Sequence, residues 1–166
     1  MTATPRRERE TVLYTTENIL KIDADVIVNP VNTTGLLTAG LSKAIVTRYP
    51  GAYRSYLGAL ATGRLRVGKV HLYQPRKGRA VLSLPTKRSV WKQGTLAYVE
   101  AGLQDFAHRY NSLGIHSIAF PMLGCGHAGL DWDQVKPLME HHLKPLKNIE
   151  ITISTYQPLT ETDHKE

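Results

Sequence analysis

The chain has 166 residues, 42% of them hydrophobic and 21% charged, a composition that predicts one soluble globular domain with a substantial core. No apolar run approaches the roughly 18 residues of a membrane helix, and the basic N-terminus lacks the apolar stretch of a secretory signal. The net charge of +7 is of the sign that attracts a polyanionic partner.

Cysteine content points to a compartment. Cys125 is the one cysteine of the chain, which excludes an intrachain disulfide and is typical of a reducing environment. We therefore expect a cytoplasmic location and no membrane partner.

The first third of the chain predicts two strands and two helices. Residues 1–10 are polar and without periodicity, so we expect a loose tail there. Val26–Asn29 is a short β-branched run, typical of a strand buried on both faces. The other expected elements are a strand over Thr11–Thr15, a loop over Pro30–Gly40, a helix from there to about Arg48, and a second helix over Ala52–Ala61.

A basic stretch follows. No acidic residue lies between Asp25 and Glu100, whereas nine Lys and Arg fall within Arg64–Lys92. This pattern fits either a solvated basic face or a surface for a polyanion such as nucleic acid. Aromatic residues there are few, namely Tyr73 and Trp91, so stacking of bases along a strand is not strongly indicated. Two strands, Lys69–Tyr73 and Ala80–Leu84, are expected around a turn at Pro75–Gly78.

The last part of the chain alternates helices and strands. Apolar residues at intervals of three and four predict a helix over Thr95–Tyr110. Asp131 is a candidate N-cap for another helix, with Gln134 completing a capping box. Strands are expected over Ser117–Pro121 and Ile149–Tyr156, and a second loose tail over residues 157–166. The order predicts one three-layer α/β/α domain with a central mixed β-sheet.

Two glycine-rich loops follow short buried strands, over Asn29–Leu41 and Pro121–Leu130. In open α/β sheets, ligands bind at the carboxyl ends of strands. Glycine lets backbone N–H groups approach an anion, and each loop leads into a helix N-terminus. Two such loops facing each other suit a diphosphate, although turn geometry alone explains many glycine-rich loops. Neither loop matches the P-loop or the dinucleotide-binding fingerprint.

Both loops resemble the signatures of a known family. Asp25-Val26-Ile27-Val28-Asn29-Pro30-Val31-Asn32-Thr33-Thr34-Gly35 resembles the first macrodomain signature, and Ala119-Phe120-Pro121-Met122-Leu123-Gly124-Cys125-Gly126 resembles the second. The resemblance covers about residues 11–156. Within the family, the chain is most similar to the branch of the DarG antitoxins and the human terminal ADP-ribose glycohydrolase. The markers are Leu84-Pro85-Thr86-Lys87-Arg88, Val99-Glu100-Ala101-Gly102-Leu103 and Gly129-Leu130-Asp131-Trp132, and Pro-Thr-Lys favours the DarG side.

The resemblance implies an ADP-ribose-binding cleft. Asn18 stands near the family position that holds the adenine amino group, or else caps a helix. Asn32 matches the family residue that contacts the distal ribose, or else serves a turn. The second loop implies backbone donors to the diphosphate. The full set of implied contacts is Asn18, Ile19, Asn32, Thr33, Gly35, Thr38, Ala39, Gly40, Leu41, Pro85, Thr86, Gly124, Cys125, Gly126, His127, Ala128 and Gly129.

Lys87 is the residue for which the resemblance implies chemistry, together with Asn32. It stands where similar hydrolases carry a lysine that acts on the anomeric carbon, and a neutral lysine amine can attack such a carbon covalently. The alternative is an ordinary surface lysine in a basic stretch. Cys125 is expected to be a small loop residue and not a nucleophile, and a direct catalytic role for His127 is not favoured.

Two departures from the family pattern bear on turnover. Thr38 stands where the first loop usually has glycine, which puts turnover in doubt more than binding. The human enzyme has an acidic residue near the position of Ala128, and the DarG-like domains lack it, so a catalytic Lys–Asp pair is not expected.

The leading hypothesis is an ADP-ribosyl glycohydrolase that removes ADP-ribose from bases of single-stranded DNA. Nucleic-acid contacts are expected at Arg76, Lys77, Arg88 and Lys92, and an ADP-ribosyltransferase toxin is a candidate partner. No metal or cofactor is expected, since the histidines form no cluster with ligand spacing. The alternatives are a non-catalytic ADP-ribose reader and a hydrolase acting on ADP-ribosylated protein carboxylates.

Overall fold

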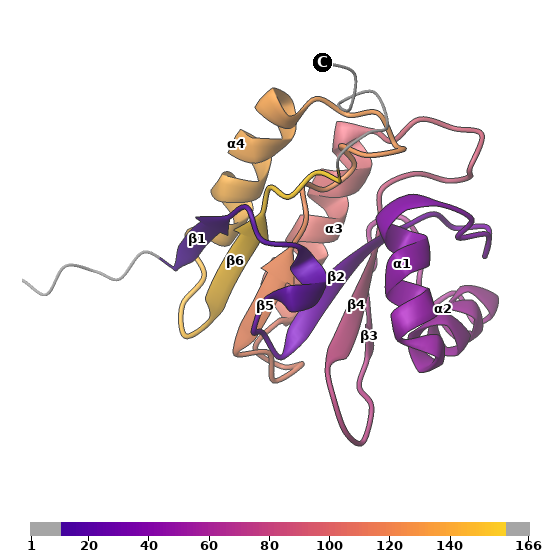
Figure 1. The fold of residues 1–166 in the computed structure, drawn as a ribbon, viewed down its shortest axis with the longest axis horizontal. Coiled ribbons are helices and arrows are strands. Elements are labelled where there is room, and N and C mark those ends of the chain that lie inside the picture. The colour runs from indigo at the N-terminus through magenta and orange to yellow at the C-terminus, as the bar shows by residue number, and fades with distance from the viewer. Residues whose placement is uncertain (1–10, 159–166) are drawn as a thin grey trace, which may run out of the picture.

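The computed structural model describes residues 11–158, which form one β-sheet between two layers of helices (Figure 1). The expected tail at residues 1–10 lies outside the described residues, and so does the expected tail at residues 157–166 except for Gln157 and Pro158. The elements in chain order are β1 (Val12–Thr15), the 3-10 helix η1 (Ile19–Lys21), β2 (Val26–Val31), α1 (Gly40–Arg48), α2 (Pro50–Ala61), β3 (His71–Tyr73), β4 (Ala80–Pro85), α3 (Leu96–Arg109), β5 (Ser117–Phe120), α4 (Trp132–Leu143) and β6 (Glu150–Ser154).

The sheet has six strands in the order β1-β6-β5-β2-β4-β3. Neighbouring strands are parallel except β3 and β4, which form an antiparallel hairpin, so the predicted mixed sheet is confirmed. β2 lies between β4 and β5, with Val26 paired to Ala80 on one side and to Ile118 on the other. After β2 the chain therefore forms β3 and β4 on one side of β2, and then crosses to form β5 and β6 on its other side. Ligand crevices form at such a switch point in α/β sheets.

Each face of the sheet has its own hydrophobic core. Helices α3 and α4 cover one face through buried residues that include Phe106 and Met139. Phe106 meets Phe120 of β5 edge-on, with ring centroids 5.3 Å apart. Helices α1 and α2 cover the other face, where Ile45 and Tyr56 are completely buried. Figure 1 shows the two helix pairs on opposite sides of the strands, as the predicted three-layer α/β/α architecture requires.

Each strand differs from its expected boundaries by one to three residues. β1 begins one residue later than expected, β4 ends one residue later, and β2 runs on through Pro30 and Val31, which were expected to belong to a loop. β3 begins at His71 and not at Lys69, because Lys69 pairs with Arg66 across a tight turn in which Gly68 has φ 82°. β5 ends at Phe120, one residue earlier than expected. β6 ends at Ser154, and the residues after it turn toward the carboxyl end of β2. Among the described residues, no helix is long and apolar enough to cross a membrane.

Candidate active site

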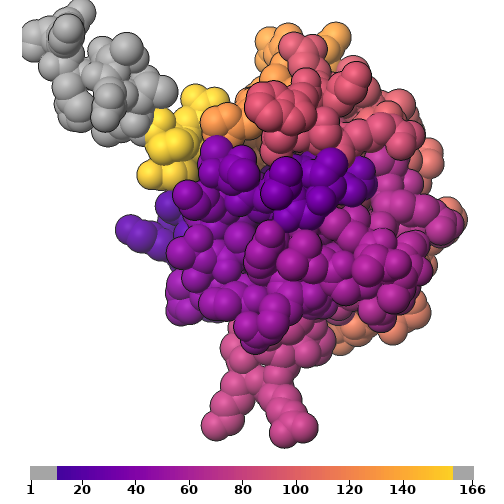
Figure 2. Space-filling model, turned by 90° about the vertical axis from the view of Figure 1, so that its right-hand side faces the viewer, coloured from indigo at the N-terminus to yellow at the C-terminus, as the bar shows by residue number. Residues whose placement is uncertain are grey.

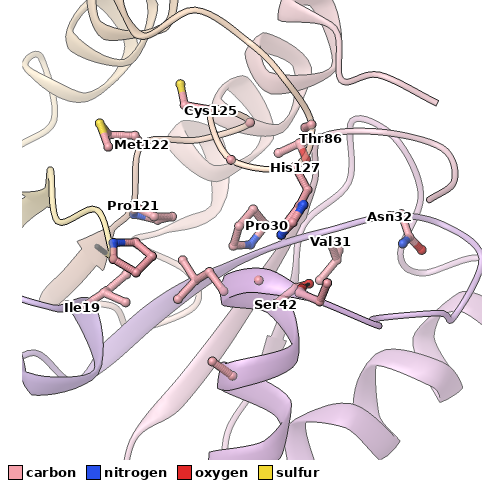
Figure 3. Close-up of a pocket in the computed structure, with 18 of the residues that line it drawn as sticks. Ile19, Pro30, Val31, Asn32, Ser42, Thr86, Pro121, Met122, Cys125 and His127 are labelled. Atoms are coloured by element: carbon pink, nitrogen blue, oxygen red, sulfur yellow. Dashed lines mark hydrogen bonds between the residues drawn. The ribbon is translucent and has the colours of Figure 1, made fainter. Parts of the chain in front are cut away.

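A cleft of about 850 Å³ opens at the carboxyl ends of β2 and β5. Segments that follow β2, β4, β5 and β6 contribute to its walls, together with η1 and the start of α1. Figure 3 shows Ile19 and Asn32 toward opposite ends of the pocket, with His127 between them. The lining residues are Asn18, Ile19, Leu20, Pro30, Val31, Asn32, Leu36, Thr38, Ala39, Gly40, Leu41, Ser42, Ala44, Thr86, Lys87, Val90, Pro121, Met122, Gly124, Cys125, Gly126, His127, Ala128, Ser154, Tyr156, Gln157 and Pro158.

One wall of the cleft is the N-terminus of α1. Its N-cap residue, Ala39, has no side chain that can accept a hydrogen bond, and the first turn contains no acidic residue. The N–H groups of a first helical turn have no intrahelical partner and carry the positive end of the helix dipole. The start of α1 at Gly40 is therefore suited to bind an anion. Thr38 does not disturb this turn, because its φ is negative and a threonine adopts the backbone conformation without strain.

The opposite wall is the glycine-rich loop after β5. Gly124 has φ 72°, and a Cβ there would lie 2.6 Å from Leu130 Cδ1, so this position requires glycine. The backbone N–H groups of Gly126, His127 and Ala128 have no hydrogen-bond partner among the described residues. Successive free N–H groups of this kind form an anion-binding nest.

His127 connects the two walls. A Cβ built on Gly40 would lie 2.5 Å from His127 Cδ2, so the imidazole ring packs directly against the backbone of Gly40. The glycine at position 40 is needed both for its φ of 64° and for this close approach. A ligand diphosphate between the two walls would lie beside the His127 ring.

Asn32 is held by a dense network. Its Oδ1 accepts hydrogen bonds from Thr34 N–H at 3.0 Å and from Tyr56 O–H at 3.2 Å, and its Nδ2 donates to Leu36 O at 2.7 Å. The side chain is only 3% exposed. Asn32 thus performs the turn-forming role that the sequence left open, and one Nδ2 hydrogen remains for a ligand hydroxyl.

Asn18 also performs the structural role that was one of its two alternatives. Its Oδ1 accepts a hydrogen bond from Leu20 N–H at 3.0 Å and so caps η1. The same side chain lines the cleft beside Ile19, which is buried. Capping and ligand contact are compatible here, because the amide keeps its Nδ2 group and a second lone pair.

Lys87 follows β4 and lines the cleft next to Thr86. The backbone of Thr86 is held on both sides, because its N–H donates to Val31 O at 2.9 Å and its carbonyl accepts from Thr95 N–H at 3.3 Å. Lys87 is half-buried and has neither a hydrogen-bond nor an ion-pair partner among the described residues. No Asp or Glu is among the described lining residues of this cleft, so no carboxylate there neutralises the lysine.

Cys125 is unsuited to nucleophilic chemistry. Burial, followed by the nearby Asp131 carboxylate, raises the pKa of the Cys125 thiol from 9.0 to about 11. At neutral pH the group is a protonated thiol, and its Sγ donates to Leu123 O at 3.5 Å.

Four of the residues predicted to contact the ligand do not line the cleft. Thr33 donates through its N–H and its hydroxyl to Arg88 O, at 3.2 and 3.0 Å. The backbone of Gly35 is bonded to the hydroxyls of Tyr53 and Tyr56. Pro85 ends β4, and the remaining one, Gly129, turns the chain with φ 77°. These residues shape the walls, whereas the other predicted positions line the cleft itself.

The predicted nucleic-acid contacts are divided between two ends of the molecule. Arg88 and Lys92 lie in the loop after β4, beside the cleft. Arg76 and Lys77 lie in the β3–β4 hairpin, and Lys77 shares a surface depression with Asp25 and Ile115, which precede β2 and β5. Figure 1 shows the hairpin and the loop after β4 at opposite ends of the sheet, and Figure 2 shows the hairpin projecting from the body. The basic stretch is therefore not one continuous surface around the cleft.

Several site residues were not predicted from the sequence. Ser154, Tyr156, Gln157 and Pro158 line the cleft, although residues from 157 onward were expected to form a loose tail. The polarity of this segment carries no signal of its position. Tyr56 supports the first loop from α2, and its spacing from Ala52 and Ala59 on one helix face predicts only that it is buried.

The comparisons with known proteins agree with the fold and the cleft. The family model described as Macro domain matches residues 28–139. The solved macrodomain of Thermus aquaticus DarG superposes with a TM-score of 0.81 at 31% identity, covering 89% of this chain and 98% of that one. The macrodomain of Mycobacterium tuberculosis DarG gives 0.81 at 30% identity, with the same coverage. The chain belongs to the macrodomain family.

Curated relatives extend the comparison to named activities. A protein of Thermus aquaticus named DNA ADP-ribosyl glycohydrolase is 31% identical over 86% of this chain, and one of Mycobacterium tuberculosis with the same name is 29% identical. The chain spans about 40% of the length of these relatives. A structure of Thermosipho africanus DarTG in complex with ADP-ribose has a TM-score of 0.83 at 29% identity, covering 89% of this chain and 42% of that one.

Proposed function

We propose that this chain binds ADP-ribose in the cleft and removes it from nucleic-acid bases as an ADP-ribosyl glycohydrolase. The observation that carries the proposal is the position of Lys87, half-buried, unpaired among the described residues and in a cleft whose described lining has no carboxylate. The structure of Thermosipho africanus DarTG with ADP-ribose supports the choice of ligand.

The walls of the cleft suggest how ADP-ribose lies in it. The diphosphate fits between the α1 N-terminus and the free N–H groups of Gly126, His127 and Ala128, since both present donors to an anion. Adenine then lies toward Asn18 and Ile19. The distal ribose lies toward Asn32 and Lys87, at the end of the cleft where the first loop meets the segment after β4.

In this pose Lys87 performs the chemistry. Its Nζ attacks the anomeric carbon of the distal ribose and forms a new C–N bond as the bond to the base breaks. The electron pair of the broken bond goes to the base nitrogen, which takes up the proton that the lysine nitrogen loses on forming the new bond. Water then hydrolyses the lysine adduct, which releases ADP-ribose and regenerates the amine. The free N–H groups on the diphosphate hold the ribose in place during both steps.

Charge and relatedness support nucleic acid as the carrier of the ADP-ribose. The chain has a net charge of +7, and the segment after β4 carries two further cations, Arg88 and Lys92, close to Lys87 in the sequence. The Thermus aquaticus and Mycobacterium tuberculosis relatives are named for activity on DNA. A Thermosipho africanus relative is named as a fusion of a DNA ADP-ribosyl transferase with a glycohydrolase, which supports such a transferase as partner.

A non-catalytic reader of ADP-ribose is the second candidate. It is favoured by the lack of Asp and Glu among the described lining residues, because general acid–base catalysis would then rest on Lys87, His127 or the substrate. Binding of free ADP-ribose is expected under both candidates, whereas cleavage is expected under only one.

The test compares the chain with Lys87→Ala and with Lys147→Ala. Lys147 is exposed in the turn before β6, so its removal changes the net charge equally, away from the cleft. ADP-ribose release is measured from an ADP-ribosylated single-stranded oligonucleotide and from an ADP-ribosylated protein, and calorimetry measures binding of free ADP-ribose. We expect the oligonucleotide to be cleaved by the unaltered chain and by Lys147→Ala, at a rate at least 100-fold above Lys87→Ala, which retains binding.

Other outcomes would change the assignment. If the chain binds free ADP-ribose but cleaves neither substrate, it is a non-catalytic reader and not a hydrolase. Equal cleavage by the unaltered chain and Lys87→Ala would remove Lys87 from its role. If ADP-ribose is released from the ADP-ribosylated protein and not from the oligonucleotide, the substrate is protein and not nucleic acid.

A further inference from the structure

The segment 86–95, which we call the rim loop, is anchored in both walls of the cleft. Near its start, Arg88 O accepts from Thr33 of the first loop through both N–H and hydroxyl. Near its end, Gly94 N–H donates to Ala128 O of the second loop at 2.8 Å. A Cβ at Gly94 would lie 2.9 Å from the Ala128 side chain, so the contact is close. The rim loop is therefore a fixed part of the cleft mouth, visible at the upper right of Figure 1.

The tip of the rim loop carries a tryptophan in solvent. Lys92 N–H donates to Ser89 O at 3.2 Å, which closes a turn over residues 89–92. Within this turn Val90 lines the cleft, whereas Trp91 is 91% exposed. The other exposed large hydrophobic side chains among the described residues reach at most 59%. An indole exposed to water lacks the favourable free energy that burial of its large aromatic surface would provide. Tryptophan is enriched in binding interfaces, where this surface becomes buried.

Two cations, Arg88 and Lys92, lie within three residues of this indole in the sequence. Arg88 Nε donates to Tyr98 O–H at 2.7 Å, and the guanidinium lies 5.3 Å from the centre of the Tyr98 ring. This arrangement holds the guanidinium in place, and its two terminal NH₂ groups have no partner among the described residues. Lys92 is exposed. An aromatic side chain beside positioned cations is the usual combination for single-stranded nucleic acid.

Distance along the chain links Trp91 to the reaction centre. Trp91 is four residues from Lys87, so their Cα atoms are at most about 14 Å apart. In the proposed pose, the base on the distal ribose lies beside Lys87, which belongs to the rim loop. The strand that carries the modified base therefore passes within reach of the indole.

We propose that Trp91 stacks on a base of the single-stranded nucleic acid that carries the ADP-ribose, while Arg88 and Lys92 bind its phosphates. The inference rests on the proposed function for the identity of the modified strand. It assigns recognition of the strand to the tip of the rim loop, whereas the chemistry belongs to Lys87 near the start of the same loop; Trp91 itself does not line the cleft. Stacking is tolerant of sequence, so Trp91 contributes affinity for the strand more than preference among bases.

The experiment uses the full chain, Trp91→Ala, Trp91→Phe and the control Leu13→Ala, which removes an exposed apolar side chain from β1. Stacking of one base is worth about 1–3 kcal/mol, equivalent to roughly ten- to hundredfold in affinity. We expect Trp91→Ala to raise the KM for an ADP-ribosylated oligonucleotide by about that factor at nearly constant kcat. Trp91→Phe should restore most of the loss, and Leu13→Ala should match the unaltered chain. Affinity for free ADP-ribose should be equal in all four proteins.

A binding measurement tests the inference independently of cleavage. Fluorescence anisotropy of an unmodified single-stranded oligonucleotide should show weaker binding to Trp91→Ala than to the unaltered chain, with Trp91→Phe between them. Arg88→Ala and Lys92→Ala should each lower the dependence of affinity on salt.

Two results would overturn the inference. If KM for the modified oligonucleotide and affinity for the unmodified one both stay within twofold in Trp91→Ala, the indole does not stack on the strand. If Trp91→Ala raises the KM for an ADP-ribosylated protein as much as the KM for the oligonucleotide, the rim loop recognises something other than nucleic acid. Failure of the proposed function alone would appear differently, as loss of cleavage in all proteins while the anisotropy difference at Trp91 persists.

Discussion

At the scale of single residues, the side chains that matter most in the cleft are those that hold others in place. Tyr56 is completely buried, and its hydroxyl donates to Asn32 O at 2.8 Å and accepts from Gly35 N–H at 3.1 Å. Burial raises the pKa of this phenol to about 12, so it is protonated and able to donate at every physiological pH. The first loop therefore depends on a tyrosine from α2 that does not line the cleft.

Removing that hydroxyl should weaken both the fold and the cleft. In Tyr56→Phe the buried Gly35 N–H loses its acceptor, a change that costs about 1–3 kcal/mol. We expect a lower urea midpoint and weaker ADP-ribose binding by calorimetry. Tyr110→Phe is the control, since its hydroxyl bonds Lys147 O before β6, away from the cleft. Tyr110→Phe should lower stability and leave ADP-ribose affinity unchanged. If the affinity of Tyr56→Phe for ADP-ribose is also unchanged, Tyr56 does not support the first loop of the cleft.

The raised pKa of Cys125 makes a second prediction at this scale. A shift from 9.0 to about 11 lowers the thiolate fraction near pH 8 by about 100-fold. Labelling of the native chain with a disulfide reagent at pH 8 should be slower by about that factor than labelling in urea, where the thiol is exposed. The native rate should rise as pH increases toward 11. Equal rates in buffer and in urea would contradict the shift.

At the scale of elements, the position of the rim loop depends on how α3 packs against β4. Gly102 of α3 faces Leu84 of β4, and a Cβ there would lie 2.7 Å from Leu84 Cγ. Leu84 is fully buried, so its branch carbon has little room to move. The glycine lets the helix approach the strand whose end carries Thr86 and Lys87.

Two glycine-to-alanine variants should therefore have opposite effects. Gly102→Ala should destabilise the chain by about 1–3 kcal/mol through overpacking and displace the rim loop. Gly58 lies in α2 with no atom within 4 Å of a built Cβ, so Gly58→Ala should stabilise the chain by about 0.5–1 kcal/mol. Urea denaturation measures both changes. A stabilised Gly102→Ala would show that α3 is free to move away from the sheet.

At the scale of the whole molecule, segments that follow four strands form one cleft, so ligand binding should stabilise the entire domain. Ligand at 100 times its Kd stabilises the native state by about 2.7 kcal/mol, which for this size raises Tm by roughly 5–10 °C. We expect this shift from ADP-ribose in a thermal melt. Adenosine, which lacks the diphosphate for α1 and the second loop, should give a much smaller shift. Equal shifts would contradict the anion-binding assignment of the two walls.

The sequence by itself determined the order of strands and helices and the two glycine-rich loops. Periodicity, N-cap residues and glycine report local backbone preferences, so Asp131 could be identified as a cap, whereas Thr95 was expected to be the first helical residue and is the N-cap of α3. The family resemblance also pointed to Lys87 and to about half of the residues that line the cleft.

Only the tertiary structure decided which of these features act together. The fold of the sheet places Arg76 and Lys77 at one end of β4 and Arg88 and Lys92 at the other, although they lie in one basic stretch of the sequence. It also brings residues after β6 into the cleft and places Tyr56 beneath Asn32. Such pairings arise between residues far apart in the chain, and local preference carries no information about them.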